Sequence, residues 1–211
     1  MLYLTGCVTS GVREQLDARK VGFMNTPNIG NRLDPSWLWA ADNGCYGKNY
    51  VGDERWLAWL SSVSAALRGN CLFATAPDVV GDAAATMERS LPWLPVIRSL
   101  GFPAAFVAQD GLTVDDTPWD EFDALFIGGG TKWKLGPDVK ALIIAAQERG
   151  KHVHVGRVNS QGRYLAFAAL GCDSADGTFL AFGPRVLLPE LMGWIRHHET
   201  QTVMFGGGGL G

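Results

Sequence analysis

A short apolar run that ends in a polar or glycine-rich cluster recurs along the whole chain. Runs of this kind have the composition of buried β-strands and occur at residues 2–7, 21–25, 37–42, 72–78, 104–109, 123–128, 152–158 and 172–178. Helical patterns fill the gaps at residues 54–67, 83–100, 137–150 and 161–170, and a closing helix is expected near 184–197. Eight strands that alternate with helices predict an α/β fold, a compact (β/α)8 TIM barrel. An open, doubly wound sheet is the alternative.

The chain is expected to form one domain. Its 211 residues lie near the lower limit for such a barrel, and with 47% hydrophobic and 18% charged residues it can build one large core. We find no internal repeat and no linker, so residues 1–205 are assigned to the barrel and the glycine-rich residues 206–211 to a flexible tail. The four cysteines are widely spaced without a C-x-x-C pair, which argues against a zinc ribbon and a disulfide framework.

Charge and hydropathy exclude some classes of function. No apolar run reaches the roughly 18 residues of a membrane span, and the N-terminus lacks a basic region followed by an apolar stretch. A cytoplasmic protein without a membrane partner is therefore expected. The net charge of −3 gives no global attraction to nucleic acid, so nucleic-acid binding would need a local basic patch.

Polar side chains fall where the expected strands end. In a barrel of this kind, the C-terminal ends of all strands meet on one face, and that face carries the catalytic residues of barrel enzymes. We therefore expect one site to gather residues that are distant in the sequence, namely Asp42, Asp78, Gln109, Asp110, Arg157 and Asp176.

Simpler structural interpretations exist for each of these residues. Asp173 and Asp176 lie in a glycine-flanked segment that suits a turn, and Asp42-Asn-Gly is also typical of turns. Asp78 could cap a helix, although Asp82 is better placed to cap one that begins at Ala83.

The chemistry of the aspartate, glutamine, tyrosine and histidine side chains bears on what such a site could bind. A carboxylate and an amide, as in Asp78 and Gln109, are suited to contact the edge of a guanine-like ring, and Tyr46 could stack on such a ring. His152 and His154 share one face of a strand, but no third ligand stands out. They are expected to be core or rim histidines, and we expect no metal site and no cofactor.

The order of these motifs resembles the tRNA-guanine transglycosylase superfamily, and most closely its small phage-type branch, which inserts 7-deazaguanine bases into DNA. The likeness extends over residues 37–178. The family's Asp-Ser-Gly-Gly-aromatic loop is similar to the segment Asp42-Asn43-Gly44-Cys45-Tyr46. The resemblance implies that Asp42 is an acid/base residue and that Tyr46 stacks on the base.

Four more segments carry the resemblance. Asp78 matches the base-reading aspartate, and the segment from Val107 to Gly111 is similar to the V-Q-G-G motif, so that Gln109 would contact the base edge. Gly128, Gly129 and Gly130 match a glycine-rich strand end whose N–H groups meet the base carbonyl. Gly171-Cys-Asp-Ser-Ala-Asp176-Gly is similar to the G-x-D-x-F-D-[CS] motif, whose second aspartate, here Asp176, is the nucleophile. Val155, before Gly156, occupies the place of the family's stacking methionine, and Ala175 that of an aromatic residue.

The resemblance implies a DNA-guanine transglycosylase that exchanges guanine in DNA for a free 7-deazaguanine base through a covalent Asp–deoxyribose intermediate. Its partners would be duplex or single-stranded DNA and the free base, in the host cytoplasm if a phage encodes it. The zinc-binding subdomain of the tRNA enzymes is missing, which leaves the oligomeric state open and includes a monomer. Phosphate contacts would come from Lys48, Lys132, Lys134, Arg157 and Arg163. Three alternatives remain: a small-molecule N-glycosidase or nucleosidase, tRNA-directed base exchange, and a non-catalytic nucleic-acid-binding accessory subunit.

Overall fold

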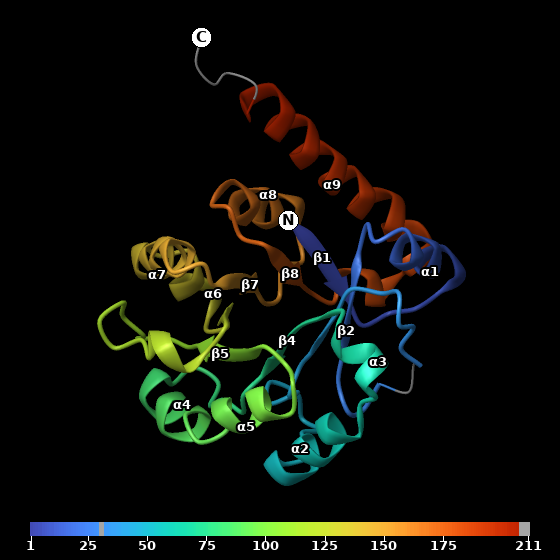
Figure 1. Cartoon of the computed structure of the whole chain (residues 1–211). Helices are drawn as coiled ribbons and strands as arrows, with labels where there is room; N and C mark the ends of the chain where they lie inside the picture. The colour runs from blue at the N-terminus through green and yellow to red at the C-terminus, as the bar shows by residue number, and fades with distance from the viewer. Residues whose placement is uncertain (30–31, 207–211) are drawn as a thin grey trace.

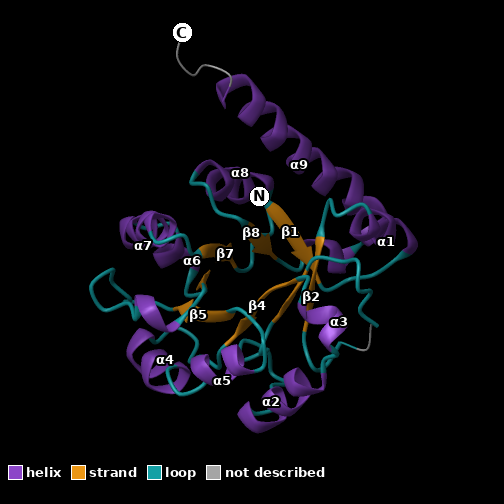
Figure 2. Cartoon of the chain, viewed as in Figure 1, coloured by secondary structure: helices purple, strands orange, loops and turns teal. Residues whose placement is uncertain are grey.

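Eight parallel strands close into a barrel in chain order in the computed structural model, which describes residues 1–29 and 32–206. The last strand pairs with the first, with Leu2 opposite Ser174 and Leu4 opposite Asp176. Figures 1 and 2 show the strands at the centre and the helices around them. This closed arrangement confirms the (β/α)8 TIM barrel and excludes the open sheet. The strands are β1 (Leu2–Thr5), β2 (Gly22–Asn25), β3 (Trp39–Ala41), β4 (Cys71–Thr75), β5 (Ala104–Ala108), β6 (Ala124–Ile127), β7 (His152–Val155) and β8 (Ser174–Asp176).

The helices pack around the barrel, and α9 lies across its outside against α8 and α1 (Figure 1). Two short 3₁₀ helices, η1 (Trp119–Glu121) and η2 (Phe179–Phe182), lie in loops. Among the described residues, no helix is both long and apolar enough to cross a membrane. The α-helices are α1 (Ser10–Asp17), α2 (Asp53–Ser62), α3 (Ala65–Arg68), α4 (Ala83–Ser90), α5 (Leu94–Ser99), α6 (Thr131–Lys134), α7 (Pro137–Glu148), α8 (Gln161–Ala169) and α9 (Pro184–Gly206).

The inside of the barrel is filled by alternate residues of the strands. One buried cluster takes a single side chain from each of six strands, namely Leu4, Met24, Ala40, Phe73, Ala105 and Ala124. Large and small side chains are mixed in this set, as the narrow interior of an eight-stranded barrel requires. Gly22 belongs to the same layer, because a Cβ atom there would lie 2.2 Å from Cδ2 of Leu4.

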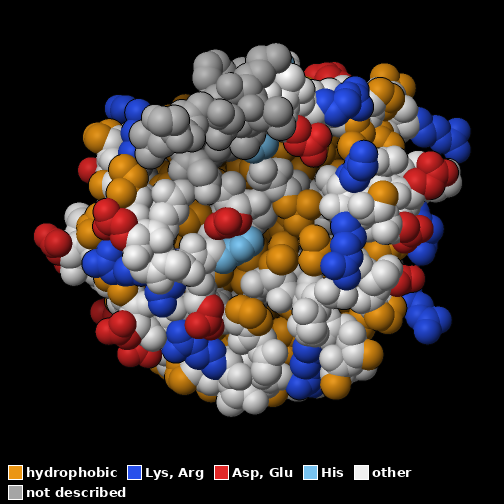
Figure 3. Space-filling view, turned by 45° about the horizontal axis from the view of Figure 1, so that its top comes forward, with side chains coloured by type: hydrophobic (Ala, Val, Ile, Leu, Met, Phe, Trp, Pro, Cys, Tyr) orange, Lys and Arg blue, Asp and Glu red, His pale blue; other side chains and the backbone are white. Residues whose placement is uncertain are grey.

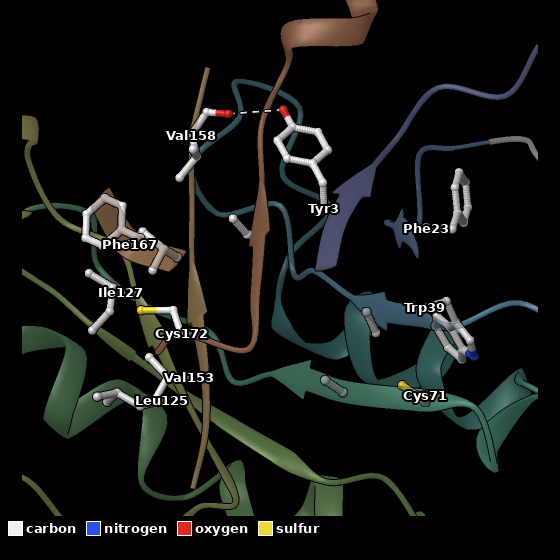
Figure 4. Close-up of a cluster of buried hydrophobic side chains, with 14 of the residues drawn as sticks. Tyr3, Phe23, Trp39, Cys71, Leu125, Ile127, Val153, Val158, Phe167 and Cys172 are labelled. Carbon is white, nitrogen blue, oxygen red and sulfur yellow. Dashed lines mark hydrogen bonds between the residues drawn. The ribbon is translucent and has the colours of Figure 1, made fainter. Parts of the chain in front are cut away.

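The other strand face packs against the helices and forms the larger core. Figure 4 shows part of it, with Leu125 and Val153 of neighbouring strands beside Cys172. The Tyr3 hydroxyl donates a hydrogen bond of 3.1 Å to the Val158 carbonyl, and so ties β1 to the loop after β7 (Figure 4). This core holds the strands in the positions from which their C-terminal ends converge.

Three expected boundaries differ from the structure. The helix expected over residues 83–100 is divided into α4 and α5, because Pro92 and Pro95 cannot continue the backbone hydrogen bonding of one helix. The helix expected over 54–67 ends at Ser62, where Val63 is extended, and α3 begins after it. α1 was not anticipated. Of the expected tail, Gly206 ends α9 and residues 207–211 lie outside the described part of the chain.

Candidate active site

A cavity of about 490 Å³ opens where the strands end. The residues around it come from the C-terminal ends of seven of the eight strands and from the loops after them, so the cavity lies on the barrel face expected to carry a site. Polar and small residues dominate its lining, with Val80, Val107 and Phe126 as apolar walls. The sequence-predicted residues that line it are Asp42, Tyr46, Lys48, Asp78, Gln109, Gly128, Gly129, Gly156, Arg157 and Asp176.

Asp176 ends β8 and points into the cavity with its side chain 23% exposed. Its Oδ1 accepts a hydrogen bond from the Arg157 backbone N–H at 3.1 Å and contacts His154 Nε2 at 3.1 Å. The N–H of Arg157 is aimed in this direction by a positive φ of 59°, an unusual conformation for a residue with a side chain. Oδ2 accepts no hydrogen bond from the described residues, so it is the oxygen available to a ligand.

Asp42 follows β3 and lies in the same cavity. Its N–H donates to the Asn25 carbonyl at 2.8 Å, and its Oδ1 accepts from the Gly44 N–H at 3.3 Å. Burial, and after it the negative charge of Asp176, raises the pKa of Asp42 to about 7. One carboxyl group that is half protonated near neutral pH therefore faces a second carboxyl group across one cavity, as general acid–base catalysis requires.

Asp78 and Gln109, which follow the neighbouring strands β4 and β5, form a buried pair that lines the same cavity. Gln109 Nε2 donates to Asp78 Oδ2 at 2.6 Å, and Asn43 Nδ2 donates to Asp78 Oδ1 at 3.0 Å. Gln109 Oε1 accepts from the N–H groups of Gly81 and Gly129, both at 2.9 Å. These partners determine the orientation of the Gln109 amide and leave one of its N–H groups for a ligand. Burial raises the pKa of Asp78, while the two amide donors oppose the rise.

The strand-end glycines allow the backbone to pack closely at the cavity. A Cβ atom on Gly128 would lie 2.9 Å from both Gln109 Nε2 and Val107 Cγ1. A Cβ atom on Gly156 would lie 2.7 Å from Phe126 Cε1 and 3.3 Å from Asp176 Oδ1. These positions therefore need glycine to keep Gln109 and Asp176 where they are.

Tyr46 and Arg157 meet at the mouth of the cavity. Tyr46 is 66% exposed, and the guanidinium carbon of Arg157 lies 4.4 Å from the centre of its ring. Arg157 also donates from its guanidinium to the Gly129 carbonyl. The contact brings together loops that follow β3 and β7, and it places an aromatic ring and a positive charge where a ligand would enter.

Val155 does not belong to the site. It precedes Gly156 in β7, and its side chain points to the opposite strand face, where it is 0% exposed within the core between strands and helices. Neighbouring residues of a strand point to opposite faces. The prediction that Val155 is a substrate-binding residue is therefore wrong.

The expected phosphate contacts are only partly placed at the cavity. Lys134 is 5% exposed and its Nζ donates to the Gly156 carbonyl, so it braces the loop after β7 and cannot meet a phosphate. Burial and the nearby charge of Arg157 lower its pKa to about 8. Within the described residues, Lys48 and Arg157 line the cavity, whereas Lys132 and Arg163 do not. On the one face of the molecule that Figure 3 draws, Lys and Arg side chains are scattered among acidic and apolar ones.

Two polar residues at the site were not anticipated. Asn43 supports Asp78, and His154 contacts Asp176 from inside the barrel. The period of two along a strand could have shown the role of His154, since it is two residues before Gly156 and therefore faces inward. Asp82 caps α4 as expected, with Oδ1 accepting from the Ala85 N–H at 2.9 Å. In the described part of the chain, no group of three or more His, Cys, Asp or Glu side chains is placed to hold a metal ion.

No protein-family model matches this chain, and no curated protein matches it. The arrangement of groups at the cavity is therefore the basis for a functional hypothesis.

Proposed function

We propose that this protein is a base-exchanging transglycosylase that removes guanine from DNA and inserts a 7-deazaguanine base. The observation that carries the proposal is that two carboxyl groups, Asp42 with its raised pKa and Asp176, line one cavity beside the Asp78–Gln109 pair. A neighbouring pair of carboxyl groups is what retaining displacement at a sugar C1′ uses, one group as nucleophile and the other as acid and base.

In the first step, Asp176 Oδ2 attacks C1′ of the nucleotide and forms an ester bond while the C1′–N9 bond breaks. The leaving guanine takes the bonding electron pair and receives the proton of the Asp42 carboxyl group. Ester formation removes the negative charge of Asp176, which is one cause of the raised pKa of Asp42. The pKa of Asp42 therefore falls as the ester forms, and this favours transfer of its proton to guanine.

In the second step, N9 of the incoming base attacks C1′, and the ester bond to Asp176 breaks. The ionised Asp42 takes the proton from N9, which restores the starting state of both carboxyl groups. Two displacements at C1′ retain its configuration. The two steps consume no cofactor, because each atom and proton that leaves with guanine is replaced by the incoming base.

The Asp78–Gln109 pair supplies selectivity for guanine-like rings. Asp78 is an acceptor and can take hydrogen bonds from N1–H and the exocyclic amino group, because each carboxylate oxygen has a second lone pair. The free N–H of Gln109 can donate to the ring carbonyl, while its own oxygen is occupied by Gly81 and Gly129. Adenine would present its amino group to the free N–H of Gln109. Both groups are donors, so both would be left without an acceptor, which is costly in a buried site.

The walls of the cavity suit a base that has left its stack. Val107 and Phe126 provide apolar surface inside the cavity, and Tyr46 provides a ring at its mouth. A duplex nucleotide must be extruded to reach Asp176, which costs a few kcal/mol and requires a pocket that packs against the base. Lys48 and Arg157, which line the cavity, would meet the backbone phosphates.

The test is base exchange in vitro with labelled guanine and duplex DNA, with a stem-loop RNA in parallel. The proposal predicts incorporation of label into DNA and replacement of guanine by a 7-deazaguanine, measured by nucleoside mass spectrometry. Release of free base without incorporation would instead identify a nucleosidase. Exchange into RNA alone would identify a tRNA-directed enzyme, and no chemistry with retained binding would identify an accessory subunit.

The pH dependence of the two half-reactions tests the role of Asp42. Single-turnover release of guanine needs the protonated carboxyl group, so its rate is expected to fall as the pH rises through about 7, the pKa of Asp42 in the free protein. Above that pH the fall is expected to be about tenfold per pH unit. Uptake of the second base by the isolated adduct needs the ionised group, so its rate is expected to rise with pH with a midpoint below that of release.

Asp42→Asn is the control for this measurement, because an amide cannot titrate in this range. Its residual release rate is expected to be low and independent of pH. A wild-type release rate that stays level from about pH 5.5 to 9 would contradict the assignment of Asp42 as the acid.

The salt dependence of DNA binding separates Lys48 from Lys134. Lys48→Ala is expected to weaken DNA binding. The slope of the logarithm of the binding constant against the logarithm of the salt concentration is expected to become shallower by about one, as for the loss of one phosphate contact. Lys134→Met is the matched control, since this buried lysine is bonded to Gly156 and meets no phosphate. Binding isotherms at several salt concentrations would measure both slopes. Equal losses in the two variants would contradict the placement of these lysines.

A further inference from the structure

A line of polar side chains runs through the barrel interior to Asp176. His152 Nε2 lies 2.7 Å from Ser174 Oγ, and the same Oγ lies 2.8 Å from His154 Nδ1. His154 Nε2 then lies 3.1 Å from Asp176 Oδ1. His154 is 0% exposed, and its ring packs against Phe73 and Phe126 at centroid distances of 4.9 and 4.5 Å.

The chemistry of these groups determines which of them donates and which accepts in each hydrogen bond. Burial lowers the pKa of His154, with a smaller contribution from the charge of Lys134, while Asp176 acts in the opposite direction. Burial also lowers the pKa of His152, to about 4, against the opposing charge of Asp173. Neutral imidazole has one donor and one acceptor nitrogen, whereas an ionised carboxylate only accepts. His154 therefore donates from Nε2 to Asp176 and accepts at Nδ1 from the Ser174 hydroxyl, whose oxygen accepts from His152.

We propose that His152, Ser174 and His154 form a one-way chain of hydrogen bonds that positions Asp176, with the Nε2–H of His154 holding Oδ1 so that Oδ2 is the attacking atom. The assignment of His154 as a positioning residue rests on the proposed function, because it concerns the nucleophile of that reaction. The chain itself rests on the geometry of the barrel interior.

A neutral donor suits this position. The Arg157 N–H and the His154 Nε2–H both bind Oδ1 and so restrict rotation of the carboxylate. Neither group carries a formal charge that would neutralise the nucleophile. The buried cation of Lys134 is bonded to the Gly156 carbonyl instead. The carboxyl group is thus oriented by two donors that bring no charge of their own.

The direction of the chain can be measured in the free protein. Long-range ¹H–¹⁵N NMR of the histidine rings is expected to show His154 as the neutral Nε2–H form near neutral pH. Ser174→Ala removes the donor to Nδ1, so its His154 signals are expected to shift toward a mixture of the two neutral forms. A His154 ring protonated at Nδ1 in the wild-type protein would overturn the proposal. This measurement uses no substrate, so its outcome is independent of whether the exchange reaction occurs.

Kinetics then test the positioning role. His154→Phe keeps the aromatic volume beside Phe73 and Phe126 but removes the donor, and is expected to slow adduct formation roughly 100-fold with little change in KM. His154→Gln places an amide N–H near the position of Nε2 and is expected to recover most of the rate. A His154→Phe protein that forms the adduct at the wild-type rate would overturn the role of His154. A wild-type protein with no exchange would overturn the proposed function. The NMR result would still show whether the hydrogen bonds from His152 to Asp176 run in the proposed direction.

Discussion

Asp176→Asn is expected to abolish both base exchange and the covalent adduct, with a loss of at least about 10⁴-fold in rate. An amide oxygen is a much weaker nucleophile than a carboxylate, and Asp176 is the residue whose carboxylate β8 presents to the cavity. Denaturing gel analysis of DNA incubated with the protein would detect the adduct. The melting temperature and DNA affinity are expected to stay near those of the wild-type protein.

Asp173→Asn is the matched control, because it makes the same chemical change three residues earlier in the chain. Asp173 Oδ2 accepts from the Val153 N–H at 2.7 Å at the other end of β8, far from the cavity lining, and an amide oxygen can accept the same bond. Exchange is expected to persist in this variant. Adduct formation at the wild-type level in Asp176→Asn would refute the assignment of the nucleophile and, with it, the proposed function.

Asp78→Asn is expected to reduce kcat/KM for guanine exchange by roughly 10³–10⁴-fold. The carboxylate accepts from Gln109 Nε2 and Asn43 Nδ2, and in the proposed complex also from the base. An amide at this position would turn an N–H group toward one of these donors and leave a buried donor unpaired. Steady-state exchange of labelled guanine measures the effect, and the melting temperature reports how much of it reflects a loss of stability.

Asp82→Asn is the control for that change. Asp82 lies in the same loop but caps α4, and an Asn side chain can also accept the hydrogen bond from the Ala85 N–H. Its exchange rate is expected to match that of the wild-type protein. If Asp78→Asn exchanged guanine as well as Asp82→Asn, Asp78 would have no part in base recognition.

The strand-end motifs could be identified without the structure because their local chemistry is unusual. Asp42, Asp78, Gln109 and Asp176 each follow an apolar run with glycine nearby, and a parallel barrel brings such ends to one face whatever the details of packing. The helix boundaries are harder to predict from the sequence. The division between α4 and α5 depends on how two prolines fit the turns around them, and α1 is short and only weakly apolar.

The residues whose roles were missed or misassigned are those whose surroundings come from other strands. Lys134 is a lysine close to a strand end, and for that reason it is predicted to contact phosphate. It is instead buried under the loop after β7, where the Gly156 carbonyl is its partner. Val155 lies next to a site glycine, but the strand pleat turns it into the helix-facing core. The sequence predicts a core or rim histidine at His154. The residue lies in the core, and its Nε2 also contacts Asp176 of the neighbouring strand.

The sequence by itself determined the barrel, through eight apolar runs with helices between them, and it determined which polar residues stand at the strand ends. Only the tertiary structure decided which of those side chains act together. Hydrogen-bond partners and burial depend on neighbours that lie 20 or more residues away, as with Gln109 and Gly129 or His154 and Asp176. The raised pKa of Asp42 has the same origin, since it arises from enclosure and from the charge of a residue at the far end of the chain.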